Sequence, residues 1–332
     1  MRISRVGFVA ACAWLGCLAA GCAATGPGLP ENAASVELSE TPFFAQERYQ
    51  CGPAALATVL SASGVEVSPG ELVSQVYVPA RRGSLQVEML AAARARGRLA
   101  YVIPGEFDAL LDELAAGRPV LILQNLGPRI WPRWHYAVVV GFDARRDEII
   151  LRSGRERRET LSRARFLASW RRAGAWGFVV LRPGALPAVP HEERYLEAAA
   201  ALESAGHTQA ARRAYETAAR TWPASPMAWL GLGNTHYARG DLRAAENAYR
   251  VLLEHAPQSP VARNNLAQVL SERGCHTAGL AQVEAGLGLL GTADELRPAL
   301  EETRAEIRSR RQAASLGGSE SDCAAGPDLS AM

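Results

Sequence analysis

Residues 46–56 of the chain read QERYQCGPAAL, and residues 135–143 read HYAVVVGFD. In the first stretch, Cys51 directly precedes a run whose apolar residues share one helical face, and Pro53 fits the first turn of a helix. The second stretch is an apolar strand that starts at a histidine. The sequence therefore predicts a cysteine at the N-terminus of a helix and a histidine at the beginning of a strand.

Cys51 and His135 are candidates for a nucleophile and its base. A thiol attacks only as its thiolate, and a helix dipole favours negative charge at the helix N-terminus. We therefore expect the position of Cys51 to lower the pKa of its thiol. The chain has six histidines, and all except His135 lie after Pro190. His135 is therefore the candidate base of the first half of the chain.

The surrounding pattern predicts an α+β domain at residues 41–183. Apolar periodicity predicts further helices and strands beyond those that carry Cys51 and His135. The predicted helices cover 85–96 and 107–116, and the predicted strands cover 119–124, 135–142, 148–152 and 177–181. Helices that come first and strands that come later are typical of the α+β class.

The stretches around Cys51 and His135 together resemble the bacteriocin-processing, double-glycine family of papain-like cysteine peptidases. The resemblance covers roughly residues 42–183 and implies a papain-like fold that hydrolyses peptides. It implies that Cys51 is the nucleophile, that His135 is the base, and that Gln46 donates to the oxyanion together with the backbone N–H of Cys51. No cofactor is implied, and we find neither a metal-ligand motif nor a phosphate-binding loop.

The third catalytic position departs from this family, because Ser153 stands where the family has an Asp. Asp143 is eight residues from His135 along one strand, about 26 Å at about 3.3 Å per residue, which is too far to replace it. If residues 143–147 form the hairpin turn, Ser153 lies beside His135. A hydroxyl orients an imidazole but does not stabilise imidazolium as a carboxylate does. The alternative is that Asn125 orients the ring from an adjacent strand.

Two further readings concern side chains near this site. We interpret Trp131, Trp134 and Tyr136 as core packing or a groove wall in preference to substrate stacking. The Arg-rich stretch 152–165 is interpreted as a solvated surface.

The N-terminus predicts export. Residues 1–21 combine a positively charged start with an uncharged apolar run, as in a signal peptide, and the run is too short to span a membrane. The end of this segment resembles a lipobox, which implies that Cys22 is lipidated and becomes the first mature residue. Ala23 follows in place of Asp, which favours the periplasmic face of the outer membrane. The alternative is an ordinary secreted protein. Residues 22–40 are typical of a tether.

The size and composition of the chain predict two domains and disfavour a nucleic-acid partner. A chain of 332 residues with 48% hydrophobic content is larger than one compact core needs. The net charge is only +2, and the positive charges are scattered rather than gathered in one block. Beyond Cys22, the remaining cysteines Cys51, Cys275 and Cys323 do not make a disulfide framework.

After a proline-rich linker at 184–191, the pattern becomes helical with a period of 34 residues. The central copy resembles a tetratricopeptide repeat at these positions: Trp229, Leu232, Gly233, Gly240, Ala245, Tyr249 and Pro257. The prediction is a helical solenoid over residues 192–304 whose three repeats span 192–225, 226–259 and 260–293. Residues 305–332 lack enough apolar content to pack and are predicted to be disordered.

Two functions fit these patterns. The first is an envelope-anchored cysteine peptidase that cleaves a peptide substrate, with the repeats recruiting the substrate or a protein partner and the lipid binding the membrane. The second is an inactive pseudo-peptidase that acts as a scaffold through its repeats. Retention of Gln46, Cys51 and His135 favours the enzyme, and loss of the family Asp favours the scaffold. We prefer the enzyme.

Overall fold

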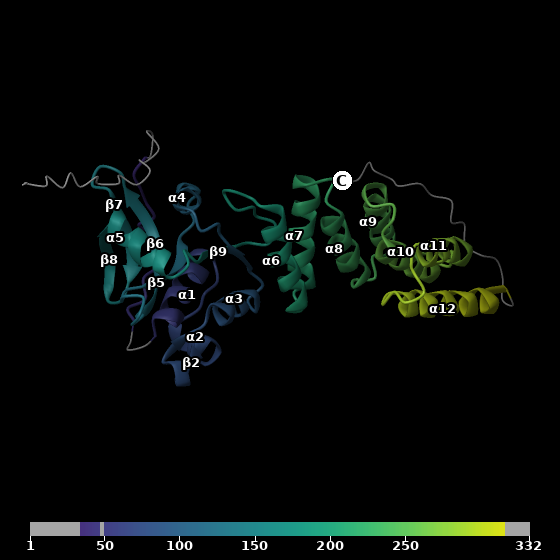
Figure 1. Ribbon diagram of the computed structural model, residues 1–332, viewed down its shortest axis with the longest axis horizontal. Helices are drawn as coiled ribbons and strands as arrows, with labels where there is room; N and C mark the ends of the chain where they lie inside the picture. Colours follow the sequence, from purple (N-terminus) through teal and green to yellow (C-terminus); the bar gives the residue numbers. More distant parts are fainter. Residues whose placement is uncertain (1–33, 47–49, 316–332) are drawn as a thin grey trace, which may run out of the picture. The chain divides into compact units, whose positions relative to one another are not determined.

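The computed structural model describes residues 34–46 and 50–315. The predicted signal peptide, the lipidation site Cys22 and residues 316–332 of the predicted tail lie outside the described residues. Within them, every strand lies between residues 36 and 181, and the chain beyond residue 191 is helical (Figure 1). The predicted α+β domain followed by an all-α domain is therefore confirmed. None of the described helices is both long and apolar enough to cross a membrane.

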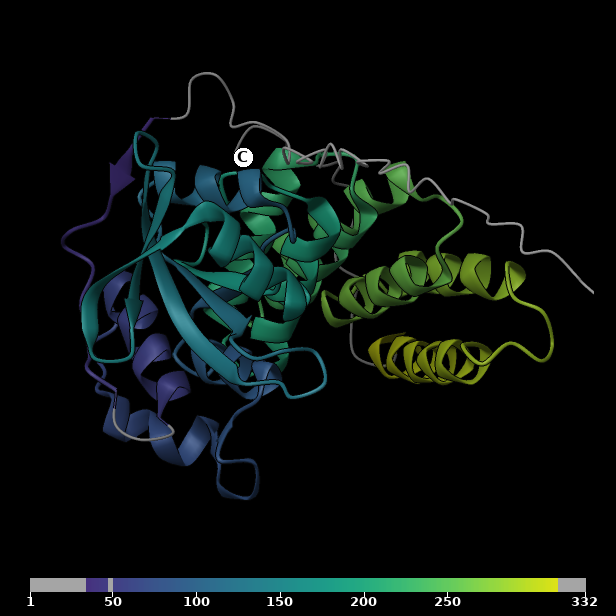
Figure 2. The ribbon, with the colours of Figure 1, turned by 60° about the vertical axis from the view of Figure 1, so that its left-hand side comes forward.

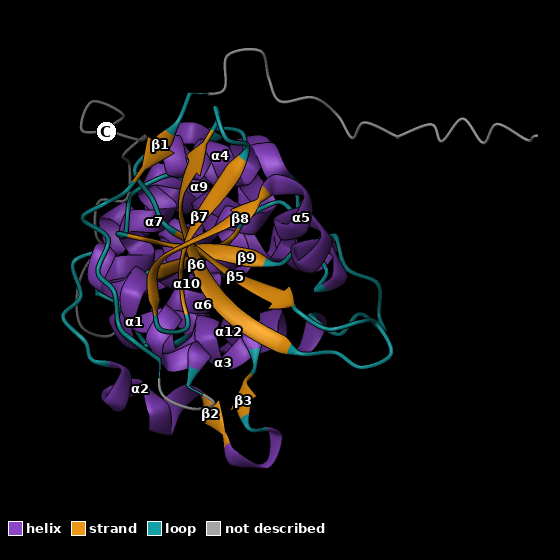
Figure 3. Cartoon of the chain, turned by 90° about the vertical axis from the view of Figure 1, so that its left-hand side faces the viewer, coloured by secondary structure: helices purple, strands orange, loops and turns teal. Residues whose placement is uncertain are grey.

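The first domain is built on a seven-stranded sheet whose neighbouring strands are antiparallel. Its main path runs through β4 (Leu99–Val102), β9 (Gly177–Leu181), β5 (Val120–Asn125), β6 (Trp134–Asp143), β7 (Glu148–Ser153) and β8 (Glu156–Ser162). The short β1 (Val36–Glu37) pairs with the end of β6. A separate ribbon of β2 (Tyr77–Val78) and β3 (Gly83–Ser84), joined by η1 (Pro79–Arg81), stands apart from this sheet (Figure 3).

One face of the sheet is covered by α1 (Cys51–Ala62), α2 (Pro69–Val76) and α3 (Gln86–Arg94). Alternate residues of β6, namely Tyr136, Val138 and Val140, share a buried cluster with Leu56 and Leu60 of α1. Helix α1 is buried along most of its length, which explains why it is apolar on nearly every side. The nucleophile candidate therefore starts the central helix of the domain.

The opposite face is covered by α4 (Phe107–Ala115) and α5 (Arg163–Arg172). The rings of Phe107 in α4 and Phe142 in β6 meet edge to face at 6.0 Å. Gln124 of β5 donates from Nε2 to the Ser169 hydroxyl of α5 at 2.8 Å. Because both faces are covered, β5 is buried at every residue, and its first four residues, 120–123, form a continuous apolar run.

The predicted helices and strands of this domain are present, but the prediction lacks α2, α5, β1, β2, β3, β4 and β8. Helix α2 has a signal in the sequence, because Ser68 and Glu71 form a capping box around it. Strand β8 has none, because its residues are mostly exposed and carry no apolar alternation.

The N-terminal boundary of the sheet also differs from the prediction. Strand β1 lies inside the range 22–40 that was assigned to the tether. Val36 pairs with Phe142, and the N–H of Leu38 donates to the carbonyl of Val140 at 2.8 Å. The two strands approach so closely that a Cβ on Gly141 would meet the Val36 carbonyl oxygen at 2.5 Å. The end of the predicted tether is therefore part of the sheet.

The second half of the chain consists of helices that pack mainly against their neighbours in sequence. They are α6 (Glu192–Ser204), α7 (Thr208–Thr221), α8 (Pro226–Tyr237), α9 (Leu242–His255), α10 (Pro260–Glu272), α11 (His276–Gly288) and α12 (Arg297–Ser315). The 34-residue period has a structural cause at the helix starts, where Ser225 and Ser259 cap α8 and α10. Gly233 is required because a Cβ there would meet the Tyr249 ring at 2.4 Å.

The prediction of a disordered tail from residue 305 is wrong for its first part. Helix α12 continues to Ser315 and lies beside α11 (Figures 1 and 2). Ile307 is fully buried in a cluster with Val283, Leu287 and Leu300. The segment is polar on average, but its few apolar residues fall on one helical face and cover the end of the repeat stack.

The bonding state of the cysteines also differs from the expectation. Cys275 is disulfide-bonded, and Cys51 is the free cysteine among the described residues. One end of a disulfide therefore lies in the repeats, which the cysteine spacing did not predict.

Candidate active site

Cys51 occupies the first position of α1, as predicted, but its thiol is not activated in the way that we expected. Burial raises the pKa of the thiol above the ordinary value of 9.0, although the backbone N–H groups of Tyr136, Gly52 and Cys51 itself act to lower it. The expectation that the helix N-terminus lowers this pKa is wrong in net direction, because desolvation outweighs the N–H groups. The resting side chain is a neutral thiol.

The β2–β3 ribbon packs closely against the first turn of α1 through Ser84. A Cβ on Gly52 would lie 2.1 Å from the Ser84 hydroxyl oxygen and 2.6 Å from its Cβ, so only glycine fits. The Ser84 hydroxyl is buried and has no hydrogen-bond partner among the described residues. The Ser84 carbonyl accepts from the Tyr136 hydroxyl at 3.3 Å. This contact joins the ribbon to the strand that carries His135.

His135 contacts Ser153, as the strand register predicted. Val138 pairs with Arg152 across β6 and β7, which places Ser153 diagonally beside His135 on the same face. The His135 Nε2 and the Ser153 Oγ are 2.9 Å apart. The predicted contact is therefore confirmed, whereas its role in catalysis stays a prediction.

The surroundings of His135 favour its neutral form. Burial lowers the pKa of the imidazole below its ordinary value of 6.5, the charge of Glu159 raises it, and that of Arg133 lowers it. Glu159 lies on β8, in the stretch that the sequence assigned to a solvated surface. It is the carboxylate that acts on His135 where the family Asp is missing. Sequence reasoning did not find it because β8 was not predicted.

Cys51 lies beside Tyr136, the residue that follows His135, whereas His135 itself is not among the residues that line the cavity at Cys51. The Cys51 sulfur faces the backbone N–H of Tyr136, the residue that follows His135. Among the described residues, no hydrogen bond joins the thiol to the imidazole. Catalytic hydrogen bonds often tighten only when substrate binds.

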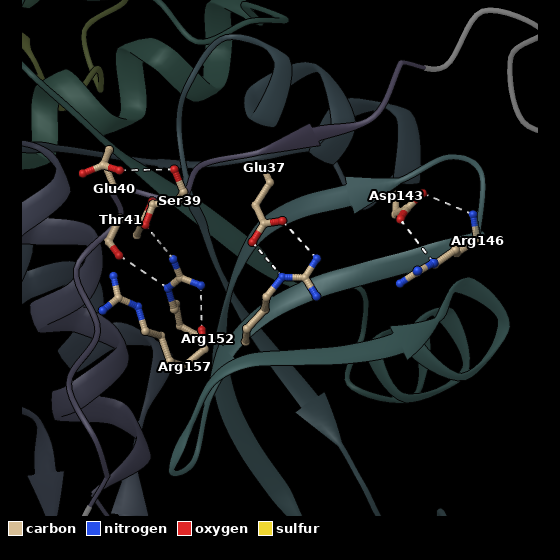
Figure 4. Close-up of polar contacts among 9 residues, drawn as sticks. Glu37, Ser39, Glu40, Thr41, Asp143, Arg146, Arg152 and Arg157 are labelled. Carbon is tan, nitrogen blue, oxygen red and sulfur yellow. Dashed lines mark hydrogen bonds and ion pairs between the residues drawn. The ribbon is translucent and has the colours of Figure 1, made fainter.

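Two other predicted side chains have different partners. The Asn125 Oδ1 accepts from the N–H groups of Gly127 and Arg133, at 3.0 and 2.9 Å. Asn125 therefore organises the loop between β5 and β6, and the side-chain contact of the His135 ring is with Ser153. Asp143 accepts from the backbone N–H groups of the turn after β6, where Arg146 also approaches it (Figure 4). The exclusion of Asp143 agrees with this placement.

Gln46 is fixed near Ser153 through its backbone. The N–H of Gln46 donates to the carbonyl of Gly154 at 2.9 Å. Residues 47–49, which connect Gln46 to the nucleophile, lie outside the described residues. The structure thus brings Gln46 to the end of β7 that carries Ser153.

The segment before Gln46, residues 36–46, is held by arginines from β7 and β8. The guanidinium of buried Arg152 donates to the carbonyls of Ser39, Thr41 and Arg157, at 3.0, 3.4 and 2.6 Å (Figure 4). Arg158 makes two bonds with the Glu37 carboxylate, at 2.9 and 3.0 Å. The reading of 152–165 as a solvated surface is therefore wrong for Arg152, whose burial no local sequence pattern reveals.

A cleft of about 650 Å³ opens beside Cys51. It is lined by Cys51, Arg81, Arg82, Gly83, Ser84, Leu85, Gln86, Leu123, Arg133, Trp134, Tyr136 and Ala173. Tyr136 is buried, as core packing predicts, whereas Trp134 is 57% exposed and forms a wall of the cleft. Trp131 is 77% exposed, so its interpretation as core is wrong.

Within the described ranges, no group of three or more His, Cys, Asp or Glu side chains gathers as metal ligands do.

Comparison with known proteins gives the same division of the chain. The Peptidase_C39 like family matches residues 38–177, and the tetratricopeptide repeat family matches residues 196–260 and 232–289. A search of curated proteins found no significant match.

Several solved structures are similar to part of this chain. A putative C39-like peptidase from Bacillus anthracis is 17% identical over 44% of this chain and 98% of its own, with a TM-score of 0.37. The peptidase domain of Streptococcus ComA, a bi-functional ABC transporter involved in a quorum sensing pathway, is 21% identical over 42% and 98%, with a TM-score of 0.36. The Yersinia enterocolitica type III secretion translocator chaperone SycD is 15% identical over 36% and 83%, with a TM-score of 0.35.

The two family matches fall on the two halves that the fold separates, the sheet domain and the run of helices. The predicted family resemblance is thereby confirmed. The chain carries a domain of the C39-like peptidase family at residues 38–177, followed by tetratricopeptide repeats at residues 196–289.

Proposed function

We propose that this protein is an envelope-anchored cysteine peptidase that cleaves a peptide substrate recruited by its repeats. The observation that carries the proposal is the contact of the His135 Nε2 with the Ser153 hydroxyl, at the strand edge where the Cys51 thiol meets the N–H of Tyr136. In this proposal Cys51 is the nucleophile, His135 is the base that Ser153 orients, and the cleft beside Cys51 receives the substrate.

The chemistry is general-base attack by a neutral thiol. With its Nε2–H donating to Ser153, the His135 ring has a free lone pair on Nδ1 that accepts the Cys51 proton. The sulfur then bonds to the substrate carbonyl carbon, and the oxyanion is stabilised by the Cys51 N–H and the Gln46 side chain. The imidazolium returns the proton to the leaving amine. Water then hydrolyses the thioester and restores the thiol.

The second candidate is an inactive pseudo-peptidase. The observation in its favour is that burial shifts the pKa values of Cys51 and His135 in the directions that oppose a thiolate–imidazolium pair. In that case the repeats alone would carry the function.

The test is peptide cleavage by the purified chain. A mixed peptide library is incubated with the wild type, Cys51→Ala, His135→Ala and, as a control away from the site, Asp143→Asn. New peptide termini are identified by mass spectrometry. We expect cleavage by the wild type and the control, and none by the other two variants. Gln46→Ala is expected to reduce the rate about 100-fold, as loss of an oxyanion donor does.

Ser153→Asp provides the sharpest comparison between the two candidates. A carboxylate at this position restores the charge that stabilises imidazolium, so cleavage is expected to rise about ten-fold or more. If the wild type and Ser153→Asp both produce no new termini that depend on Cys51, the scaffold candidate replaces the enzyme.

The anchor is a separate part of the proposal. It is supported by the charged start, the short apolar run and the position of Cys22 directly after Gly21. In cells fed a labelled fatty acid, we expect the label on the wild-type chain but not on Cys22→Ser. Equal labelling of both chains would contradict lipidation at Cys22.

A further inference from the structure

Two adjoining cavities follow one face of the repeat helices. The first, about 630 Å³, lies between α6 and α8, and the second, about 440 Å³, is formed by α8, α10 and α12. Asn234 of α8 lines both, so we treat them as one repeat groove. None of its lining residues belongs to the cleft at Cys51.

The repeat groove is acidic in a chain that is slightly basic overall. Its lining contains Glu192, Glu193, Glu197, Glu203, Glu302 and Glu306 and includes no arginine. The whole chain has 36 positive residues, all of them Arg, and 34 acidic ones. The groove lining therefore departs from the near-neutral balance of the whole chain, although Glu193 and Glu197 also line a neighbouring cavity together with Arg94 and Arg194.

Ordinary structural roles explain only some of these carboxylates. Glu192 and Glu193 lie in the first turn of α6, where the helix dipole favours them, and Glu306 pairs with Arg310. Glu197 and Glu203 lie beyond the first turn. Glu203 accepts from the Tyr215 hydroxyl, and Glu197 makes no ion pair within the described ranges. A cavity lining with six carboxylates and no cationic side chain attracts a cationic partner.

The groove also offers apolar and amide contacts. Leu196, Met227 and Leu230 line its first cavity, and Met227 is 59% exposed. Asn264 lines the second cavity, and its buried Oδ1 has no hydrogen-bond partner among the described residues. An exposed apolar side chain and the amide side chains that line the second cavity match the side chains and backbone groups of a polypeptide, rather than a small cation alone.

We propose that the repeat groove binds an extended polypeptide segment that carries Arg or Lys together with an apolar residue. The inference rests on the proposed recruiting role of the repeats and specifies the chemistry of the partner. The tail of this chain does not fit, because residues 316–332 contain Glu320, Asp322 and Asp328 and no Arg or Lys. The occupant is therefore a segment of another protein, the recruited substrate.

The test measures binding in the full chain with Cys51→Ala, so that no peptide is cut. The probes are two fluorescein-labelled peptides of equal length, one alternating Arg and Leu and the other alternating Glu and Leu. Anisotropy is measured at low and high salt. We expect the Arg-Leu peptide to bind, the Glu-Leu peptide not to bind, and the affinity to fall with salt.

Two matched variants locate the binding. Glu193→Gln with Glu197→Gln removes two groove charges, whereas Glu254→Gln with Glu295→Gln removes two exposed charges that lie outside the groove lining. The first pair is expected to weaken binding about five-fold and the second pair to leave it unchanged. Met227→Ala is expected to weaken binding several-fold without any change of charge.

The outcomes separate this inference from the proposed peptidase activity. Equal binding of the two peptides, no binding, or equal losses in both double variants would overturn the inference. If the groove binds the Arg-Leu peptide but the wild type cleaves nothing, the peptidase proposal fails and the groove inference stands. If the wild type cleaves library peptides but does not bind the Arg-Leu peptide, only the groove inference fails.

Discussion

At the scale of single residues, burial controls the chemistry of the site. Cys51 and His135 both lose solvent, and desolvation disfavours the charged form of each group. The pKa of the thiol therefore moves up while that of the imidazole moves down. The free protein therefore favours a neutral thiol and a neutral imidazole, and in the proposed reaction the proton is transferred during the attack.

The pH dependence of alkylation follows from these shifts. Because the pKa of Cys51 is raised above 9.0, its thiolate forms only in alkaline solution. We expect the iodoacetamide labelling rate of Cys51, followed by mass spectrometry, to keep rising as the pH passes 9.0 and to change little in His135→Ala. Glutathione serves as the reference thiol, because Cys275 is disulfide-bonded. A labelling plateau below pH 7 that disappears in His135→Ala would instead demonstrate an ion pair in the free protein.

A substitution at Gly52 tests how tightly the first turn of α1 packs against Ser84. In Gly52→Ala, the new methyl group would lie 2.1 Å from the Ser84 hydroxyl oxygen, so the ribbon or the helix start must move. We expect unfolding free energy to fall by about 1–3 kcal/mol, as for other overpacked sites. Ser84→Gly in the same chain removes the obstacle and should recover most of the loss in denaturant titrations. A Gly52→Ala chain as stable as the wild type would show that this approach is not tight.

At the scale of elements, the segment 36–46 depends on β7 and β8. Arg152 donates to the carbonyls of Ser39 and Thr41 (Figure 4), and the carbonyl of Gly154 accepts from the N–H of Gln46. These bonds hold the backbone of Gln46 next to Gly154, the residue that follows Ser153.

Replacing the buried guanidinium should therefore affect both stability and activity. In Arg152→Met, the three carbonyls that Arg152 binds lose their donor, which is expected to cost about 1–3 kcal/mol of unfolding free energy. If the peptidase proposal holds, cleavage also slows because Gln46 is less well positioned. Arg155→Met, at an exposed position of the same hairpin, is the control and should match the wild type in both measurements. Equal effects of the two variants would contradict a fastening role for Arg152.

Helix α12 closes the repeat stack through Ile307. Ile307→Ala leaves a cavity among Val283, Leu287 and Leu300, and we expect a loss of about 2–5 kcal/mol in chemical denaturation. Leu289→Ala is the matched control, because Leu289 is 42% exposed and its truncation leaves no enclosed cavity. If both variants lose the same stability, α12 does not seal the core of the repeats.

At the scale of the whole molecule, the sequence predicted the two-part architecture because both parts have strong local signals. Strand β6 is visible in the sequence as an apolar run between His135 and Asp143. The repeats are visible as a 34-residue period. The Ser153 contact was predictable too, because a short turn fixes the register of a hairpin and the register fixes which side chains meet. Retention of Gln46, Cys51 and His135 is likewise visible in the sequence alone.

Only the tertiary structure decided the electrostatics of the site and the limits of the folded parts. The pKa direction of Cys51 depends on how much of the chain covers the thiol, which no helix-start pattern contains. Arg152 and Glu159 acquire their roles from strands distant in sequence, and Ile307 from a core formed by other helices. Local patterns determine which elements form, whereas burial and charge at a site are sums over neighbours that only the folded chain brings together.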